Sequence, residues 1–214
     1  MRLPNDTQRL AIIGRTGSGK TQAAVWHLSV RRFDLMPWIV FNFKSDGLIN
    51  DIPGTKTIGL DSKIPERPGI YIVEPSPDEK DGCDDFLSRC WSKQNVGIYI
   101  DEGYMLSGLS AFRRCLTQGR SRNIPMIILS QRPVWLDRFV WSEADFFQVF
   151  SVSMADDKKT IEGYVGSRAK KLPEFHSTWY DVGNDTTTLL RPVPSRDSLI
   201  SSFRRRMFPN RKVI

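Results

Sequence analysis

Short apolar runs alternate along the chain with longer segments in which apolar residues recur at helical spacing. The runs are rich in β-branched and aromatic residues and are bounded by Gly, Pro or acidic residues, which predicts buried β-strands. The expected strands are Leu10–Gly14, Trp38–Phe43, Ile70–Pro75, Val96–Glu102, Pro125–Gln131 and Asp145–Ser153, with a short strand around Ile58.

The segments between the strands have helical periodicity. Phe86, Leu87, Cys90 and Trp91 share one helix face, which predicts an amphipathic helix over 78–93. Further helices are expected over 20–31, 109–118 and 155–166. Because strands alternate with helices, the pattern predicts an α/β domain whose mainly parallel sheet is flanked by helices.

The last part of the chain has a different character. Two β-prone runs within 176–190 flank Gly183-Asn184-Asp185, which predicts a β-hairpin. From Arg191 onward there are seven basic residues, Arg211 and Lys212 among them, and one acid, so the segment carries +6 of the net charge of +7. The expected division is a core over 1–175, and a hairpin and basic tail over 176–214 packed on the same domain.

Two interpretations of the basic tail remain open. It is either a solvated terminal helix with a frayed end, or a segment that touches nucleic acid, a membrane or another subunit. On the second interpretation, the candidate DNA-binding residues are Arg204, Arg205 and Arg206.

Composition narrows the class of protein. The 214 residues are 40% hydrophobic and 26% charged, as in a soluble globular domain. A sequence pI of about 9.5 favours a polyanionic partner, nucleic acid before an anionic membrane. Three cysteines without a CxxC pattern and two histidines indicate neither a disulfide framework nor a zinc site. No signal peptide and no run of about 20 apolar residues is present, so a cytoplasmic protein is expected.

A glycine-rich loop connects the first predicted strand to the first predicted helix. Its sequence, GRTGSGKT, fits G-x-x-x-x-G-K-[ST] in full, and this pattern binds nucleotide phosphates when it lies between a strand and a helix. Glycines let backbone N–H groups turn toward phosphate oxygens, and the helix N-terminus adds a partial positive charge. Lys20 is expected to reach the β- and γ-phosphates, and Thr21 to hold Mg²⁺. The expected ATP-binding residues are Gly14, Arg15, Thr16, Gly17, Ser18, Gly19, Lys20 and Thr21.

Two acids end the strand whose sequence is IYIDE. Asp101 beside the phosphate loop can bind Mg²⁺ or its water, and Glu102 can act as a general base toward the water that attacks the γ-phosphate. The alternative is a polar junction between a strand and a loop. A glutamate next to the Mg²⁺-binding aspartate points to hydrolysis that drives motion.

The next strand has polar residues at both ends. Gln131 ends it at the carboxyl edge of the sheet, where a glutamine can sense the γ-phosphate or simply satisfy loop backbone. Arg120 and Arg122 precede it, at the opposite edge. Such an arginine can reach the nucleotide of a neighbouring subunit, or it can belong to a surface or DNA-facing basic pair.

Together, AIIGRTGSGKT, IYIDE and GRSRNIPMIILSQRP resemble the FtsK/HerA superfamily of ring-forming DNA-pumping ATPases. FFQVFSVSMADDKKTI is similar to the strand and helix that follow the sensor in FtsK-type motors, and the resemblance covers roughly 10–166. It implies a RecA-like P-loop NTPase fold of the additional-strand, catalytic-glutamate class.

The resemblance also implies roles for individual residues. It assigns Mg²⁺ binding to Asp101, the catalytic base to Glu102 and the sensor to Gln131. Arg120, eleven residues before that glutamine, occupies the position of the family's arginine finger, which acts in trans, and Arg122 is the fallback.

A bare motor domain of this size looks like the genome-packaging ATPases of tailless icosahedral viruses with an internal membrane. By resemblance, such enzymes push double-stranded DNA into a preformed capsid through a special vertex. ATP and Mg²⁺ are then the expected cofactors. The expected partners are double-stranded DNA, further copies of the chain in a pentameric or hexameric ring, and capsid or membrane proteins of the packaging vertex. The expected location is the host cytoplasm and the virion vertex, as a soluble protein that is not secreted.

Three other functions remain open at this point. Filamentous-phage assembly and conjugation-type DNA-transfer ATPases belong to the same superfamily but usually carry membrane anchors. A small-molecule P-loop kinase needs a lid and an acceptor pocket, and it does not account for Glu102 or the QRP that ends the later strand. A non-catalytic module would hold nucleotide only as a structural ligand.

Overall fold

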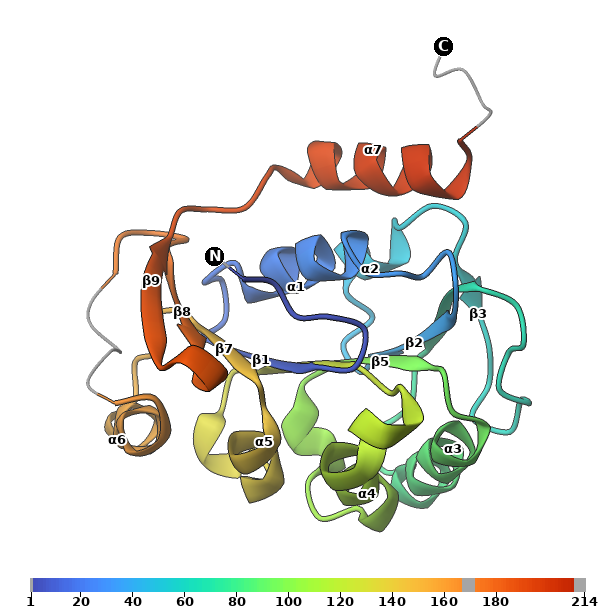
Figure 1. The fold of residues 1–214 in the computed structure, drawn as a ribbon, viewed down its shortest axis with the longest axis horizontal. Helices are drawn as coiled ribbons and strands as arrows, with labels where there is room; N and C mark the ends of the chain where they lie inside the picture. The colour runs from blue at the N-terminus through green and yellow to red at the C-terminus, as the bar shows by residue number, and fades with distance from the viewer. Residues whose placement is uncertain (1, 167–171, 210–214) are drawn as a thin grey trace.

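The computed structural model describes residues 2–166 and 172–209, which form a central sheet between two layers of helices (Figure 1). Within these residues the sheet has nine strands in the order β3-β4-β2-β5-β6-β1-β7-β8-β9. The strands are β1 Arg9–Ile13, β2 Pro37–Asn42, β3 Lys56–Thr57, β4 Gly69–Val73, β5 Gly97–Asp101, β6 Met126–Ser130, β7 Phe146–Val149, β8 Ser177–Asp181 and β9 Thr186–Leu190.

Strands β1 to β7 are parallel to one another, and β8 and β9 add two antiparallel pairings at one edge. The prediction of a mainly parallel α/β sheet is therefore confirmed. β6 lies between β1, which precedes the glycine-rich loop, and β5, which ends in the two acids. The hairpin expected within 176–190 is formed by β8 and β9.

Helices cover both faces of the sheet (Figure 1). On one face lie α1 Lys20–Ser29, α2 Gly47–Asn50 and α7 Arg196–Met207. On the other lie α3 Lys80–Lys93, α4 Ser110–Gln118, α5 Arg138–Glu143 and α6 Ala155–Val165. Short 3₁₀ turns are η1 Gly103–Leu106, η2 Gly119–Arg122, η3 Pro133–Trp135 and η4 Val182–Asn184. None of the helices within the described residues combines the length and apolar character needed to cross a bilayer.

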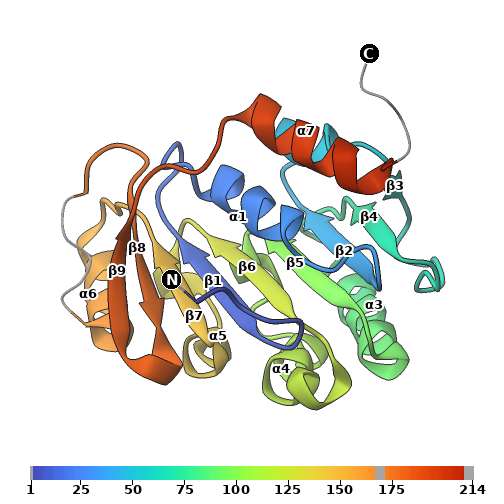
Figure 2. The same cartoon turned by 45° about the horizontal axis from the view of Figure 1, so that its top comes forward.

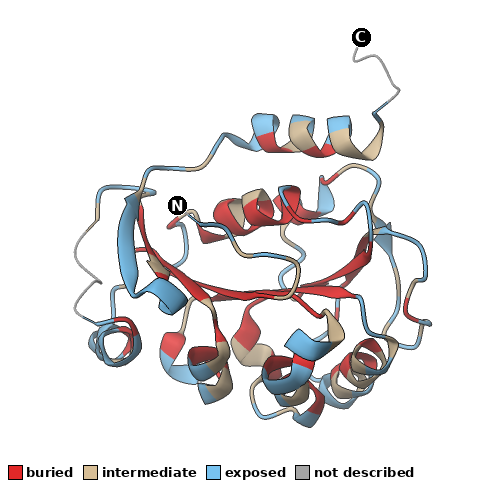
Figure 3. Cartoon of the chain, in the orientation of Figure 1, coloured by how far each residue is buried: buried red, intermediate tan, exposed pale blue. Residues whose placement is uncertain are grey.

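The core consists of two apolar clusters, one on each face of the sheet. Side chains alternate along each strand, so that Leu10 and Ile12 of β1 pack toward α1 while Ala11 and Ile13 pack toward the other face. Figure 3 shows the inner strands buried on both sides and β9 exposed at the edge. Central strands buried on both faces explain why the sequence shows continuous apolar runs rather than alternation.

Some predicted boundaries differ from the structure. The strand expected over 145–153 is limited to β7, and α2 and α5 were not expected. The basic tail forms α7 as far as Met207, which lies along α1 (Figure 2). It binds there because Leu199 and Phe203 are buried in the core, with the ring of Phe203 5.6 Å from that of Phe33.

The three candidate DNA-binding arginines of α7 are not equivalent. Arg206 donates to the carboxylate of Asp34 at 2.7 Å, and its guanidinium lies 4.2 Å from the centre of the Phe33 ring. It therefore holds α7 on the domain. Arg204 and Arg205 are exposed. Arg211 and Lys212 lie outside the described residues.

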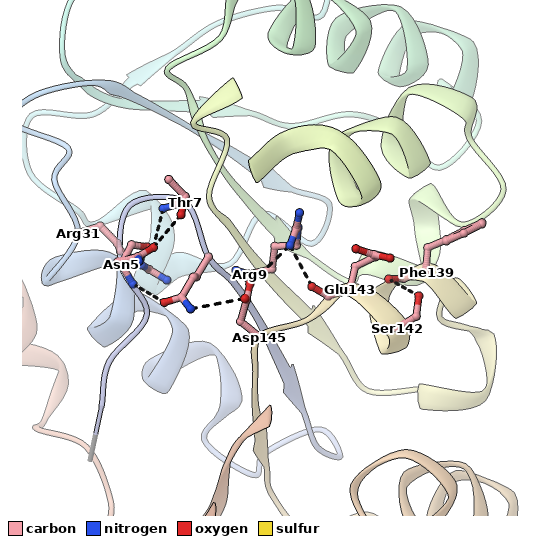
Figure 4. A network of polar contacts seen from close by, with 9 residues as sticks. Asn5, Thr7, Arg9, Arg31, Phe139, Ser142, Glu143 and Asp145 are labelled. Atoms are coloured by element: carbon pink, nitrogen blue, oxygen red, sulfur yellow. Dashed lines mark hydrogen bonds and ion pairs between the residues drawn. The ribbon is translucent and has the colours of Figure 1, made fainter. Parts of the chain in front are cut away.

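A polar network closes the amino-terminal edge of the sheet (Figure 4). The side chain of Arg9 donates to the carbonyl oxygen of Glu143 at 3.1 Å, and its backbone N–H donates to the carboxylate of Asp145 at 2.8 Å. Arg31 donates to the carbonyl oxygen of Asn5 at 2.6 Å. These contacts fix the segment before β1 at this edge, opposite the glycine-rich loop.

Candidate active site

The glycine-rich loop leaves the carboxyl end of β1 and leads into α1. Gly17 and Gly19 have φ values of 75° and 95°, a region in which residues with a Cβ are strained. A Cβ at Gly14 would lie 2.6 Å from Ser18 Oγ and 2.7 Å from Phe150 Cβ, so the loop has no room for a side chain there. The loop thus has the geometry in which backbone N–H groups face an anion at a helix N-terminus.

Asp101 ends β5 beside this loop and Glu102 follows it; the two residues are 2% and 1% exposed. Glu102 has φ 65° and ψ 64°, a left-handed conformation that is rare and strained for a residue other than glycine. The next residue has to be glycine, because a Cβ at Gly103 would lie 2.4 Å from Ile128 Cγ2 of β6. The chain therefore turns sharply at Glu102.

Two lysines contact the buried carboxylates. Glu102 Oε1 pairs with Lys44 Nζ, and it lies 3.9 Å from Lys20 Nζ. Burial raises the pKa of Asp101 from 3.8 to about 6, and the charge of Glu102 adds to the rise while both lysines oppose it. Burial also lowers the pKa of Lys20, which the charge of Glu102 opposes. The site thus brings together two buried acids, the buried Lys20 and the exposed Lys44.

Gln131 joins the acidic pair to the glycine-rich loop. Its backbone N–H donates to Glu102 Oε2 at 3.3 Å, and its Oε1 accepts a hydrogen bond from Thr16 Oγ1 at 2.5 Å. A glutamine in this position contacts both sides of the site.

A cavity of about 390 Å³ opens between these groups. Its lining consists of Thr16, Gly17, Gly19, Lys20, Thr21, Gln22, Lys44, Asp46, Leu48, Asp101, Glu102, Phe175 and Arg196. Arg15 and Ser18 line a separate cavity on the outer side of the loop. Five of the residues expected to bind ATP therefore face the acidic pair: Thr16, Gly17, Gly19, Lys20 and Thr21.

The donor set of this cavity fits Mg²⁺ and a nucleoside triphosphate. Asp101 and Thr21 present oxygen ligands of the kind that Mg²⁺ prefers, and Mg²⁺ sites of this type take their remaining ligands from water and phosphate. Lys20 is buried at the first position of α1, where its ammonium group is available to phosphate oxygens. A glycine-lined loop next to it leaves space for the phosphates.

Neither of the candidate arginine fingers lies in this cavity. Arg120 is exposed in η2, at the amino edge of the sheet. The pKa of Arg9 is lowered mainly by the burial of Arg9 itself, and the positive charge of Arg120 adds to that lowering. Arg122 is held by Trp91, because its guanidinium lies 3.5 Å from the ring centre and donates to the Trp91 carbonyl oxygen at 3.4 Å. Of the two arginines, Arg120 is therefore the more exposed.

Several residues that line the cavity were not predicted from the sequence. Lys44 and Asp46 follow β2, whose carboxyl end lies at the same edge of the sheet as that of β5, so their position after an apolar run was an available signal. Phe175 and Arg196 come from the far end of the chain, and no local pattern marks them. Arg196 also donates to the carbonyl oxygen of Gly47 at 3.0 Å.

Comparison with known proteins shows which of them share this fold. No protein-family profile matches the chain. Among solved structures it is similar to the genome packaging NTPase B204 from Sulfolobus turreted icosahedral virus 2 in complex with AMPPCP. That match has a TM-score of 0.72 at 19% identity and covers 89% of this chain and all of that one. It is also similar to the pCW3 conjugation coupling protein TcpA, with a TM-score of 0.60 at 12% identity over 91% of this chain and 64% of the other. At these identities the likeness shows a shared fold.

A comparison of sequences gives a closer relationship. The chain is 44% identical to the DNA packaging ATPase P9 of Enterobacteria phage PRD1, in an alignment 218 positions long that covers 95% of each protein. Identity of this extent along nearly the whole of both chains shows common descent and a common fold. The chain belongs to the family of viral DNA packaging ATPases that includes P9.

Proposed function

We propose that this chain hydrolyses ATP with Mg²⁺ and uses the energy to move double-stranded DNA into a preformed viral capsid. The observation that carries the proposal is the buried Asp101–Glu102 pair, which faces Lys20 across the phosphate-binding loop and is linked through Gln131 to that loop. The name of its relative, a DNA packaging ATPase, supports DNA as the cargo.

Each residue at the cavity has a distinct task in this reaction. Lys20 and the backbone of the loop bind the β- and γ-phosphates, while Thr21 and Asp101 hold Mg²⁺. When bound, Mg²⁺ neutralises charge on the phosphate oxygens. Glu102 accepts a proton from the attacking water at Oε1.

The contacts of Glu102 suggest how its carboxylate is kept inactive without nucleotide. Lys44 and Lys20 both contact Oε1, the atom that accepts the proton. A bound γ-phosphate gives both ammonium groups a second anion, which leaves Oε1 free for the water. Binding of ATP would then leave the Glu102 carboxylate able to act as the base.

The turns that follow Glu102 and Gln131 connect the site to an exposed surface. Tyr104 in η1 packs edge-on against Trp135 in η3 with ring centres 5.7 Å apart, and Ser107 donates to the Trp135 carbonyl oxygen at 2.9 Å. Loss of the γ-phosphate changes the partners of both site residues, so the two turns respond together. This is the structural basis we propose for coupling hydrolysis to motion.

The partners follow from charge and from the position of Arg120. A net charge of +7 favours the phosphate backbone of DNA, which is bound without regard to sequence. Arg120 faces away from the nucleotide cavity of its own chain, so it acts on the nucleotide of the next copy in a pentameric or hexameric ring. The ring docks on capsid or membrane proteins at one vertex of the virion.

The test is DNA-stimulated ATP hydrolysis by Glu102→Gln. The amide cannot accept the proton, so phosphate release should fall at least about a hundredfold while the Kd for ATP stays within a few fold. Glu162→Gln, an exposed change on α6, is the matched control and should behave like the native protein. Native turnover by Glu102→Gln would remove the proposed base. Native protein that hydrolyses no ATP with duplex DNA present would overturn the function itself.

A further inference from the structure

We propose that the nucleoside half of ATP binds in a second, apolar pocket on the β7–β8 side of the phosphate-binding loop, with Phe175 stacked on the ring of the base. This inference rests on the proposed function and extends it to the part of the substrate that carries no charge. It also gives a role to the hairpin, for which the sequence indicates none.

The pocket adjoins the phosphate cavity. Its volume is about 150 Å³, and its walls include Gly19, Gln22, Phe150, Phe175, Pro192 and Val193. Gly19, Gln22 and Phe175 also line the cavity that contains Lys20 and the two acids. One ligand can therefore occupy both spaces by crossing the start of α1.

The order of the strands determines which end of the ligand lies in which space. β1 has β6 on one side and β7 on the other. Glu102 and Gln131, which act on the γ-phosphate, belong to the β5–β6 side. The opposite end of the triphosphate, with its nucleoside, then leaves the loop on the β7 side, where Phe150 follows the last residue of β7.

Two aromatic rings form the walls of this pocket above the loop. A Cβ placed on Gly19 would lie 3.3 Å from Phe175 Cδ1 and 3.7 Å from Phe150 Cε1, so both rings are close to the loop backbone. Phe150 is 4% exposed and fixed, whereas Phe175 is 46% exposed, with φ 57°. A large apolar ring left in water in a strained backbone conformation gains contact when a planar base covers it.

The third wall is fixed to α1. Gln22 in the first turn of α1 donates its side-chain N–H to the carbonyl oxygen of Pro194 at 2.7 Å. This bond holds the segment after β9, with Pro192 and Val193, against the start of the helix. The segment that follows the hairpin thus forms one wall of the pocket, although this segment is distant from the phosphate-binding loop in the sequence.

The floor of the pocket offers no free hydrogen-bonding group from Gln148. The Oε1 of this buried side chain accepts a hydrogen bond from His27 Nε2 at 2.8 Å, and its Nε2 donates to Ser177 Oγ at 2.8 Å. Both ends of the amide are therefore already bonded, and the described residues of the lining include no carboxylate. The lining also includes the charged side chain of Arg191, and its apolar walls favour recognition by the face of the ring.

The experiment compares two ligands that share the phosphates and differ in the nucleoside. Calorimetry with Mg²⁺ gives the Kd of ATP and of inorganic tripolyphosphate for native protein, Phe175→Ala, Phe175→Trp and Val182→Ala. Phe175→Ala should raise the Kd for ATP roughly ten- to a hundredfold and leave that for tripolyphosphate unchanged, as expected when a stacking ring is removed. Phe175→Trp should bind ATP like the native protein. Val182 is an equally exposed apolar residue in the turn at the far end of the hairpin, and its alanine variant should change neither Kd.

Native affinity of Phe175→Ala for ATP, or an equal loss for both ligands, overturns the inference. The proposed function fails on a different result, the absence of ATP hydrolysis by native protein with DNA, and that result leaves the comparison of the two ligands intact.

Discussion

Replacing Asp101 with Asn should stabilise the nucleotide-free protein at neutral pH and at the same time abolish its Mg²⁺-dependent turnover. The reason is that this carboxylate is buried beside another acid, which raises its pKa from 3.8 to about 6. A group whose pKa is higher in the folded state than in the unfolded state stabilises the fold when protonated and loses that contribution as the pH rises. Asparagine has the shape of the protonated acid and cannot ionise.

The size of the effect follows from the two pKa values. At about 1.4 kcal/mol per pH unit, a rise from 3.8 to about 6 corresponds to roughly 3 kcal/mol of stability that the native protein lacks at pH 8. At pH 5 the folded-state carboxyl is mostly protonated, and the difference between variant and native protein falls to roughly 1.5 kcal/mol. Below about pH 4 it vanishes.

Urea denaturation with EDTA at pH 8 and pH 5 measures both differences. Asp137→Asn is the matched control, because it makes the same chemical change at another buried aspartate whose pKa is shifted in the opposite direction. Burial raises the pKa of Asp137, but hydrogen bonds from the Phe139 and Gly108 N–H groups and from Arg113 outweigh it and leave the pKa lowered. That variant should be less stable than the native protein at pH 8. An Asp101→Asn protein no more stable than native at pH 8, or equally stabilised at both pH values, would refute the reasoning.

Three further predictions concern the helix layers and the ring. Phe203→Ala should lower the free energy of unfolding by about 3–5 kcal/mol in urea titrations, because its ring is buried between α7 and the core. Arg204→Ala, an exposed change on the same helix, should leave it within about 0.5 kcal/mol. Gly103→Ala should destabilise by about 1–3 kcal/mol in the same assay because its methyl group would collide with β6, whereas Gly163→Ala, with nothing within 4 Å inside α6, should stabilise by up to about 1 kcal/mol. Arg120→Ala should reduce DNA-stimulated phosphate release by roughly 10³-fold, and mixing it with the inactive variant of the catalytic glutamate should restore part of the activity; undiminished turnover of the alanine variant would exclude the arginine.

The parts of the fold that depend on local pattern could be predicted from the sequence. Apolar runs bounded by glycine, proline or acids located the central strands because these strands are buried on both faces. The tail could not be predicted, since its place depends on Leu199 and Phe203 meeting Phe33, which precedes them by more than 150 residues. A charge pattern alone did not reveal that Arg206 binds the domain itself.

The candidate site divides in the same way. Lys20, Asp101 and Gln131 could be found because each stands at a strand end or in a short motif, and parallel strands bring their carboxyl ends to one edge. The nucleoside pocket could not, because its walls come from the end of β7, the segment before β8 and the segment after β9. Two of these strands are antiparallel, so which of their ends reaches the loop depends on hairpin pairing rather than on a motif.

The charges at the site explain why a stabilising substitution there should be inactivating. Two acids and two lysines lie together at the site. Asp101, Glu102 and Lys20 are buried, whereas Lys44 is exposed and pairs with Glu102. Mg²⁺ adds a positive partner for Asp101, and the triphosphate adds a negative partner for Lys20 and Lys44. Binding of both therefore gives Asp101 and the two lysines new partners of opposite charge and frees Glu102 for the attacking water, which lowers the cost of burying these charges. Asp101→Asn removes an unfavourable buried charge from the nucleotide-free site but also removes a ligand of Mg²⁺. The substitution should therefore raise the free energy of unfolding and lower the rate of ATP hydrolysis.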